Sequence, residues 1–303
     1  MSETLIDEIK QLQKEKNAVI LAHNYQLPEI QDIADFTGDS LELARKAKEV
    51  EAAQMIVFCG VRFMAETAKI LNPGKKVLLP APDAGCPLAD MAKVEDVVEM
   101  KKKYLGAFVV SYVNTSAQVK AVSDVCCTSS NAPAVVRNVP SDTVIFLPDK
   151  NLGYFVQKQV PEKKLIVWDG YCFVHRQFTF ADLKKARELY PDSEILVHPE
   201  CNPEIQENAD FVLSTSGMLK RAKVSQAKTI IIGTEEGLLH KLKKENPEKQ
   251  FFSLGPARIC VNMKKTTLEK LKNCLENEDN EIILEDEIMK KARNALERMI
   301  EYV

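Results

Sequence analysis

The 303-residue chain lacks long apolar runs and carries almost no net charge. No stretch approaches the roughly 18 apolar residues that a membrane span needs. Residues 1–17 mix charged and apolar residues at helical spacing, unlike a signal peptide, so we expect a cytoplasmic protein without a membrane partner. Its 41 basic residues nearly balance its 44 acidic ones, which gives no electrostatic reason to expect nucleic acid. The expected partner is a small molecule.

Several short motifs are also missing. The chain has eight cysteines but no C-x-x-C, no G-x-G-x-x-G after a β-type run and no G-x-x-x-x-G-K-[ST]. These absences argue against a zinc site, a dinucleotide and a nucleoside triphosphate. In a chain expected in the cytoplasm, the cysteines are core residues, metal ligands or catalytic thiols before they are disulfides.

What the chain does contain is a threefold repeat. Residues 23–36 read HNYQLPEIQDIADF and residues 198–211 read HPECNPEIQENADF, so P-E-I-Q-x-x-A-D-F recurs after 175 residues. A weaker copy, YVNTSAQVKAVSDV, begins at residue 112, which makes the spacings 89 and 86 residues. Short β-branched runs alternate with amphipathic stretches throughout, as is typical of parallel strands buried between helices.

The repeat predicts the fold. We expect an α/β protein made of three homologous three-layer αβα domains, with parallel sheets, arranged around a pseudo-threefold axis. The predicted units are residues 1–85, 86–171 and 172–260. Residues 261–303 are predicted to form a C-terminal helical segment that packs back on the repeats.

Each unit ends with a strand and a loop that carries a cysteine. Cys86, Cys172 and Cys260 lie 86 and 88 residues apart, which matches the repeat. Ligands collect at the carboxyl ends of parallel strands, so we expect these thiols to meet near the axis and to bind a metal. A [4Fe-4S] cluster with three cysteine ligands keeps one iron open, and that iron is a Lewis acid. Three unrelated loop cysteines are the alternative.

The other five cysteines point to the core rather than to a metal. Cys59, Cys126, Cys127 and Cys274 lie in apolar runs or at helical spacing. Cys201 is the one competing ligand, although its counterparts in the other copies are not cysteine.

Polar residues follow the first strand of each unit. His23, Tyr112 and His198 occupy one repeat position, and Tyr25, Asn114 and Glu200 occupy the position two residues later, as the sequence shows. Histidine, tyrosine and glutamate can all transfer protons, so this ring is a candidate for general acid-base catalysis. A structural hydrogen-bond ring that ties the domains together is the alternative.

Three hydroxyl residues, Ser40, Ser129 and Thr215, also recur at matched positions where helices are expected to begin. One such residue alone indicates only a helix cap. Three of them facing one point, with the positive ends of their helices, predict a cradle for carboxylates or phosphate. The expected substrate is therefore a small polyanion.

The assembled motifs resemble the quinolinate synthase family, whose members make the pyridine ring of NAD. The resemblance covers essentially the whole chain and rests on LAHNYQLPEIQDIADFTGDS, APDAGCPLADM, SYVNTSAQVKAVSDVCCTSSNA, DGYCFVHRQF, VHPECNPEIQENADF, STSGML and CVNMKKTTL. It implies one [4Fe-4S] cluster on the three repeat cysteines, with one open iron. It also implies condensation of iminosuccinate with dihydroxyacetone phosphate to quinolinate, phosphate and two waters. The C-x-x-C-x-x-C near the end of some members is absent here, which puts a thiol switch based on it in doubt.

The resemblance also implies site residues. Catalytic roles fall on Glu200, Tyr25, Tyr112 and His198. The substrate-binding positions are His23, Ser40, Tyr112, Val113, Asn114, Ser129, His198, Pro199, Glu200 and Thr215. Functional coupling to the enzyme that produces iminosuccinate is part of this prediction, and the chain is expected to be a monomer or a homodimer.

Two other functions stay open on the sequence. One is an aconitase-like [4Fe-4S] hydro-lyase that acts on a single small polycarboxylate. The other is a non-catalytic cluster sensor, which would need a partner-binding surface.

Overall fold

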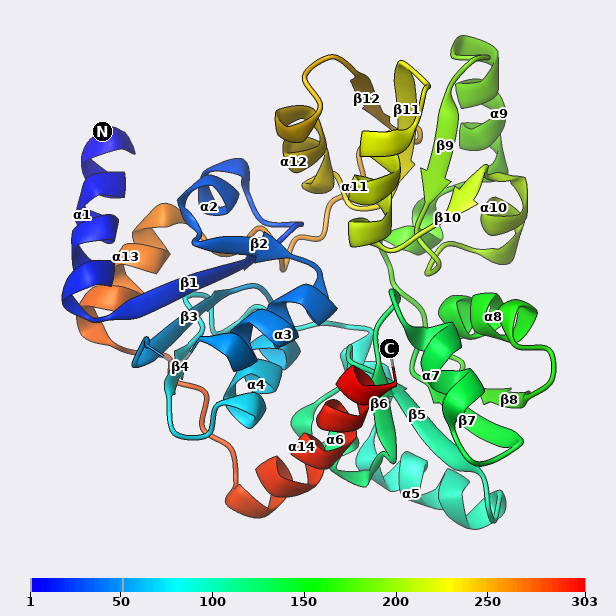
Figure 1. Cartoon of the computed structure of the whole chain (residues 1–303), viewed down its shortest axis with the longest axis horizontal. Helices are drawn as coiled ribbons and strands as arrows, with labels where there is room; N and C mark the ends of the chain where they lie inside the picture. The colour runs from blue at the N-terminus through cyan, green and yellow to red at the C-terminus, as the bar shows by residue number, and fades with distance from the viewer. Residues whose placement is uncertain (1, 51, 303) are drawn as a thin grey trace.

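The computed structural model of the chain describes residues 2–50 and 52–302. It contains three separate four-stranded parallel sheets, each with helices packed against it (Figure 1). The predicted α/β class with three αβα domains is therefore confirmed.

The first sheet has the strand order β2-β1-β3-β4. The central strand β3 is buried along its whole length, and β1 is buried over its last four residues. The elements of this domain are α1 (Ser2–Glu15), β1 (Ala18–His23), α2 (Pro28–Ile33), β2 (Phe36–Gly38), α3 (Ser40–Glu49), β3 (Met55–Cys59), α4 (Arg62–Leu71) and β4 (Lys76–Leu78).

The second sheet repeats this order as β6-β5-β7-β8. Its elements are the 3-10 helix η1 (Ala89–Met91), α5 (Val94–Lys103), β5 (Phe108–Tyr112), α6 (Ala117–Val122), β6 (Val125–Cys127), α7 (Ala132–Asn138), β7 (Thr143–Leu147), α8 (Lys150–Gln159) and β8 (Lys164–Val167).

The third sheet has the order β10-β9-β11-β12, so all three domains share one topology. Its elements are the 3-10 helix η2 (His175–Gln177), α9 (Phe180–Leu189), β9 (Glu194–Val197), α10 (Pro203–Asn208), β10 (Phe211–Val212), α11 (Thr215–Val224), β11 (Thr229–Gly233), α12 (Leu238–Glu245) and β12 (Gln250–Ser253).

The strand register repeats as well as the order. The pairs Leu21 with Phe36, Val110 with Val125 and Leu196 with Phe211 are equivalent partners in the three sheets. Each pair is shifted by 89 or 86 residues from the last, so the period found in the sequence is the period of the fold.

A repeated aspartate ties each sheet together at its amino edge. The carboxylates of Asp35, Asp124 and Asp210 accept hydrogen bonds of 2.7–2.8 Å from backbone amides at the starts of β1, β5 and β9. These are the aspartates of the A-D-F motif and its weaker copy. Their repetition therefore has a structural cause, because each one pairs a strand amide that has no partner in the ladder.

Two helices follow the third sheet. The helix α13 (Leu268–Asn277) packs on α1 of the first domain, whereas α14 (Asp286–Glu301) packs on α6, β6 and α4 between the first and second domains (Figure 1). The domain boundaries at residues 85, 171 and 260 stay a prediction.

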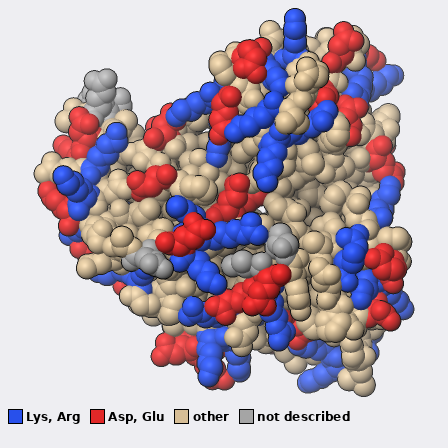
Figure 2. Space-filling view, in the orientation of Figure 1, with Lys and Arg blue, Asp and Glu red and all other residues tan. Residues whose placement is uncertain are grey.

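Within residues 2–50 and 52–302, no helix is both long enough and apolar enough to cross a membrane. Basic and acidic side chains alternate over the face drawn in Figure 2, without a large patch of either sign.

The aspartate contact generates a stability prediction. Asp210→Ala should lower the free energy of unfolding by about 1.5 to 3 kcal/mol, the typical contribution of a hydrogen bond to a charged group. Urea denaturation measures this. Asp192→Ala, an exposed residue in the loop before β9, is the control and should change stability little. Equal losses in both variants would contradict the role of the motif aspartate.

Candidate active site

A cavity of about 310 Å³ opens where the carboxyl ends of the three sheets meet. This volume lies at the lower end of the range typical of small-molecule sites. Its lining includes most of the residues that the sequence predicts, namely His23, Tyr25, Ser40, Cys86, Tyr112, Asn114, Ser129, Cys172, His198, Glu200, Thr215 and Cys260.

Two predicted binding residues do not line this cavity. Val113 is buried in the hydrophobic core behind Asn114, and the carbonyl of Pro199 accepts a hydrogen bond from Gln206. Any contact that they make with a ligand stays a prediction. Cys201 also lies outside the lining, fully buried, with its thiol donating to a backbone carbonyl 3.5 Å away.

The three repeat cysteines come together at this cavity. Each follows the last strand of a sheet, and each is half-buried, whereas the other five cysteines are buried. Cys86 has Cys260 as a neighbour, and Cys172 has Cys86, so the negative charge of one thiolate would oppose ionisation of the next. Burial raises the pKa of all three thiols, that of Cys86 to about 12, so a cation that binds here must displace their protons.

The three repeat thiols do not form a tight site for a single ion. Among the described residues, the group of three or more metal-binding side chains with ligand atoms all within 4.8 Å consists of Cys172, His175 and Glu200. A single zinc ion binds thiolates at about 2.3 Å, which would hold its sulfurs closer together than 4.8 Å. Three thiols that line one cavity are the type of ligand that iron-sulfur clusters require.

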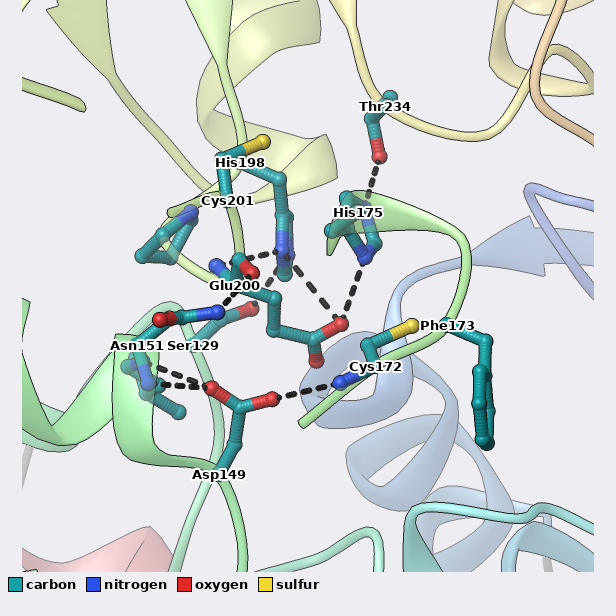
Figure 3. Close-up of polar contacts among 12 residues, drawn as sticks. Ser129, Asp149, Asn151, Cys172, Phe173, His175, His198, Glu200, Cys201 and Thr234 are labelled. Carbon is teal, nitrogen blue, oxygen red and sulfur yellow. Dashed lines mark hydrogen bonds and ion pairs between the residues drawn. The ribbon is translucent and has the colours of Figure 1, made fainter. Parts of the chain in front are cut away.

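Two buried carboxylates hold the loops of these cysteines. Asp149 accepts a hydrogen bond of 3.1 Å from the amide of Cys172, and Glu235 accepts one of 3.0 Å from the amide of Cys260 (Figure 3 for Asp149). Burial raises the pKa of Asp149, and the charge of Glu200 raises it further. Both carboxylates follow the third strand of a repeat, 86 residues apart, so the period could have revealed them.

Glu200 lies at the centre of a buried polar network. One of its carboxylate oxygens accepts a hydrogen bond of 2.6 Å from the hydroxyl of Tyr112. The other lies 2.7 Å from Nδ1 of His175 and 3.9 Å from Nδ1 of His198 (Figure 3). Burial favours the neutral acid, but the neighbouring His175 outweighs burial and holds the pKa of Glu200 below its ordinary value. Glu200 is therefore ionised at neutral pH although its side chain is buried.

The network continues from His175 to the first domain. Nε2 of His175 lies 2.8 Å from the hydroxyl of Thr234, which lies 2.6 Å from the hydroxyl of Tyr25. Tyr25 and Tyr112 thus lie at the two ends of one chain of polar contacts with Glu200 inside it. Burial raises the pKa of both tyrosines, so each keeps its proton at neutral pH. Such a chain can move a proton across the cavity.

Sequence reasoning missed His175 and Thr234. The signal for His175 was its position three residues after Cys172, in C-F-V-H. Thr234 directly follows β11, at the carboxyl edge of the third sheet. Neither residue has a polar counterpart of the same kind in the other copies, so the repeat pointed to neither.

The three predicted hydroxyl residues line the cavity, but the helix caps differ from the prediction. Ser40 and Thr215 are the first residues of α3 and α11, and the residues before them, Asp39 and Ser214, cap these helices. Ser129 precedes α7, whose N-cap position is Asn131 and which has no side-chain cap hydrogen bond. The hydroxyls of Ser40 and Thr215 are therefore not used as caps.

One serine joins these helix starts. The hydroxyl of Ser130 lies 2.7 Å from a carboxylate oxygen of Asp39 and 2.8 Å from the hydroxyl of Ser214, so all three domains contribute to one contact. No lysine or arginine appears among the described residues that line the cavity. An anion would be bound here by hydroxyls and by the helix N-termini of α3 and α11.

The two ring histidines bring no charge to the cavity at neutral pH. Burial lowers the pKa of His23 to about 4 and that of His198 to about 3. They therefore act as neutral hydrogen-bonding groups, and Nε2 of His198 lies 3.2 Å from the hydroxyl of Ser129.

The exposure of the thiols generates a labelling prediction. In metal-free protein, brief treatment with iodoacetamide should modify Cys86, Cys172 and Cys260 before the five buried cysteines. Because burial raises their pKa values, labelling should speed up as the pH rises above neutrality. Peptide mass spectrometry identifies the modified residues. Early modification of Cys201 would contradict the assignment of this thiol group.

Comparisons with known proteins agree with this geometry. A family model described as Quinolinate synthetase A protein matches residues 7–301. The quinolinate synthase of Alkaliphilus metalliredigens is 55% identical over 302 residues, with 99% of each chain covered. That of Caldicellulosiruptor bescii is 55% identical, with 99% of this chain and 98% of its own covered. That of Aquifex aeolicus is 52% identical, with 97% of this chain and 92% of its own covered.

Solved structures add no information. Aspartate transcarbamoylase from Trypanosoma cruzi matches with a TM-score of 0.16 and 10% identity over 97% of this chain and 91% of its own, too low to support any argument. On the family model and the curated relatives, the chain belongs to the quinolinate synthase family, the enzymes that make quinolinate for NAD biosynthesis.

Proposed function

We propose that this cavity condenses iminosuccinate with dihydroxyacetone phosphate to give quinolinate, phosphate and two waters. The atoms of the two substrates balance those of the products without an oxidant or a reductant. The observation that carries the proposal is that the ionised Glu200, with its two neighbouring histidines, shares one cavity with the three repeat cysteines. Family membership favours neither a hydro-lyase with a single substrate nor a non-catalytic sensor.

We propose that Cys86, Cys172 and Cys260 hold one [4Fe-4S] cluster. Their common place in the lining of one cavity, their partial exposure and the carboxylates that fix the amides of two of them support this assignment. When bound, such a cluster supplies one iron without a protein ligand, which acts as a Lewis acid toward a substrate oxygen.

The hydroxyl cradle is assigned to the acidic groups of the substrates. Ser40, Ser129 and Thr215 would donate hydrogen bonds to carboxylates and phosphate, with the N-termini of α3 and α11 adding partial positive charge. His23 and Asn114 would orient the substrates from the same ring. Val113 and Pro199, which directly precede Asn114 and Glu200, complete the proposed binding set.

Proton transfer is assigned to the Glu200 network. After carbon-carbon bond formation has expelled phosphate, Glu200 would take a proton from one carbon and return it during ketone-to-aldehyde isomerisation. Tyr112 and His175 stabilise its carboxylate, while Tyr25 is reached through Thr234. His198 lies beside Glu200 and completes the proposed catalytic set.

We further propose that the reaction takes place in the cytoplasm, in a monomer or a homodimer, with iminosuccinate received from the enzyme that produces it. The domain boundaries near residues 85, 171 and 260 belong to the same set of proposals.

The cluster assignment predicts a pattern of iron binding. After anaerobic reconstitution, Cys86→Ala, Cys172→Ala and Cys260→Ala should each lose most of their cluster, measured by iron content and visible absorbance. Cys201→Ala should keep it, because its thiol is fully buried outside the cavity. If Cys201→Ala lost its iron while Cys172→Ala kept it, the repeat argument would be wrong.

The role of Glu200 predicts a loss of turnover. Glu200→Gln keeps the shape of the side chain but cannot accept a proton, so quinolinate formation should fall by about 100- to 10,000-fold. An anaerobic assay would measure quinolinate and phosphate formed per cluster.

Thr215→Ala is the comparison variant for this assay. It removes a hydroxyl from the anion cradle and should mainly weaken substrate binding. Wild-type turnover in Glu200→Gln would remove this residue from the mechanism, and absence of quinolinate from the unmodified protein would refute the proposed function itself.

A further inference from the structure

Three buried side chains occupy one position of the repeat. They are Gln31, Lys120 and Gln206, which lie 89 and 86 residues apart on the short helices α2, α6 and α10. Lys120 is fully buried, and the two glutamines are 6% and 7% exposed. Burial of a lysine and two amides beside a catalytic cavity is costly unless their donors are used.

Each of these side chains binds the two carbonyls on either side of one residue. Nε2 of Gln31 donates to the carbonyls of Asn24 and Gln26, at 3.1 and 2.9 Å, and so brackets Tyr25.

The third domain repeats this arrangement. Nε2 of Gln206 donates to the carbonyls of Pro199 and Cys201, at 2.8 and 2.7 Å, and so brackets Glu200.

In the second domain a lysine takes the same part. Nζ of Lys120 donates to the carbonyl of Val113 at 2.8 Å and to that of Thr115, and so brackets Asn114. Lysine and glutamine differ in charge and in shape but share buried N–H donors. The shared feature of the repeat position is therefore the pair of donated hydrogen bonds and not the residue type.

The bracketed residues are the ones that face the cavity. Tyr25, Asn114 and Glu200 all line it, and each is the central residue of a tight turn that follows the first strand of its domain. A donor that holds both flanking carbonyls fixes the orientation of these peptide groups. It thereby fixes the direction of the central side chain without touching that side chain.

The same donors also reach the neighbouring domain. Nε2 of Gln31 also lies 2.9 Å from the carbonyl of Gly237 before α12, and Nε2 of Gln206 lies 3.0 Å from that of Asn151 in α8, so the two N–H groups of each amide are shared among three carbonyls. Nζ of Lys120 lies 5.4 Å from the centre of the Phe63 ring in α4. Each turn is therefore held against the fourth α-helix of the next domain (α12, α4 or α8), in a cycle around the axis.

We propose that Gln31, Lys120 and Gln206 are positioning residues that aim Tyr25, Asn114 and Glu200 into the cavity. The inference rests on the roles assigned to those three residues under the proposed function. This repeat position therefore supports the active site at the carboxyl ends of the strands. The motif aspartates instead stabilise the amino ends of the strands.

A partly buried lysine of the second domain, Lys163, offers a control. Nζ of Lys163 donates to the carbonyls of Val139 and Ser141, both at 3.0 Å. This contact lies at the amino edge of the sheet, away from the cavity. Lys120→Met and Lys163→Met thus remove the same kind of contact from the two ends of one domain.

The experiment compares these two variants with Lys120→Gln, which carries the residue that the other repeats have at this position. Lys120→Met should raise the KM for quinolinate formation by about 10- to 100-fold, because Asn114 is displaced from its substrate-binding orientation. Lys163→Met should leave kcat and KM within about twofold of the unmodified protein, even if it lowers thermal stability as much as Lys120→Met does. Lys120→Gln should recover most of the lost affinity.

Gln206→Met provides a second arm. It should lower kcat rather than raise KM, because Glu200 is placed in proton transfer and not only in binding. This arm decides the question if Lys120→Met does not fold.

A measurement independent of turnover completes the test. Hydrogen exchange of residues 113–115 should increase in Lys120→Met and not in Lys163→Met. Equal kinetics and equal exchange in these two variants, or a Lys120→Gln variant as impaired as Lys120→Met, would overturn the proposal. If the unmodified protein forms no quinolinate, the proposed function fails, and exchange at residues 113–115 still tests the positioning role.

Discussion

Three sheets direct their carboxyl edges at one buried space, and the backbone polar groups at those edges must find partners without water. The rest of the architecture follows from that constraint. Side chains from the short helices supply donors to the turns, and carboxylates after the third strands accept from the cysteine amides. Because the partners are often in the next domain, satisfying the backbone also joins the domains.

The same constraint determines the electrostatics of the cavity. The described lining residues include no lysine or arginine. The groups available to bind an anion are therefore hydroxyls and helix N-termini, not full positive charges. Burial keeps His23 and His198 neutral, which leaves Glu200 as an ionised group that depends on the close contact with His175. A carboxylate held in this way stays ionised at neutral pH and is ready to accept a substrate proton, although its lowered pKa makes it a weaker base than a carboxylate surrounded by water.

The threefold repeat in the sequence made the three-domain fold and much of the candidate site predictable. Equal spacing placed Cys86, Cys172 and Cys260 in one cavity because equivalent residues of equivalent domains face the same axis. The period could not predict His175 or Thr234, whose roles come from contacts with Glu200 and Tyr25 across domain boundaries. Gln31 and Gln206 were visible inside the shared P-E-I-Q, but a lysine at the middle copy hid their common function until the carbonyls they bind were known. The caps of α3 and α11 lie one residue earlier than predicted. The side chains of Asp39 and Ser214 accept hydrogen bonds from the first amides of these helices.

The helix α14 bears on how the enzyme is made. It packs across α4 of the first domain and α6 of the second, and the side chain of Asn131 donates to the carbonyl of Met299 at 3.1 Å. Because α14 follows all three sheets in the sequence, it leaves the ribosome after each of them. Domains generally fold as units during synthesis, the N-terminal one first. The surfaces of α4 and α6 that α14 covers therefore stay exposed until the third domain has been translated. During that interval the nascent chain is exposed to aggregation through these surfaces.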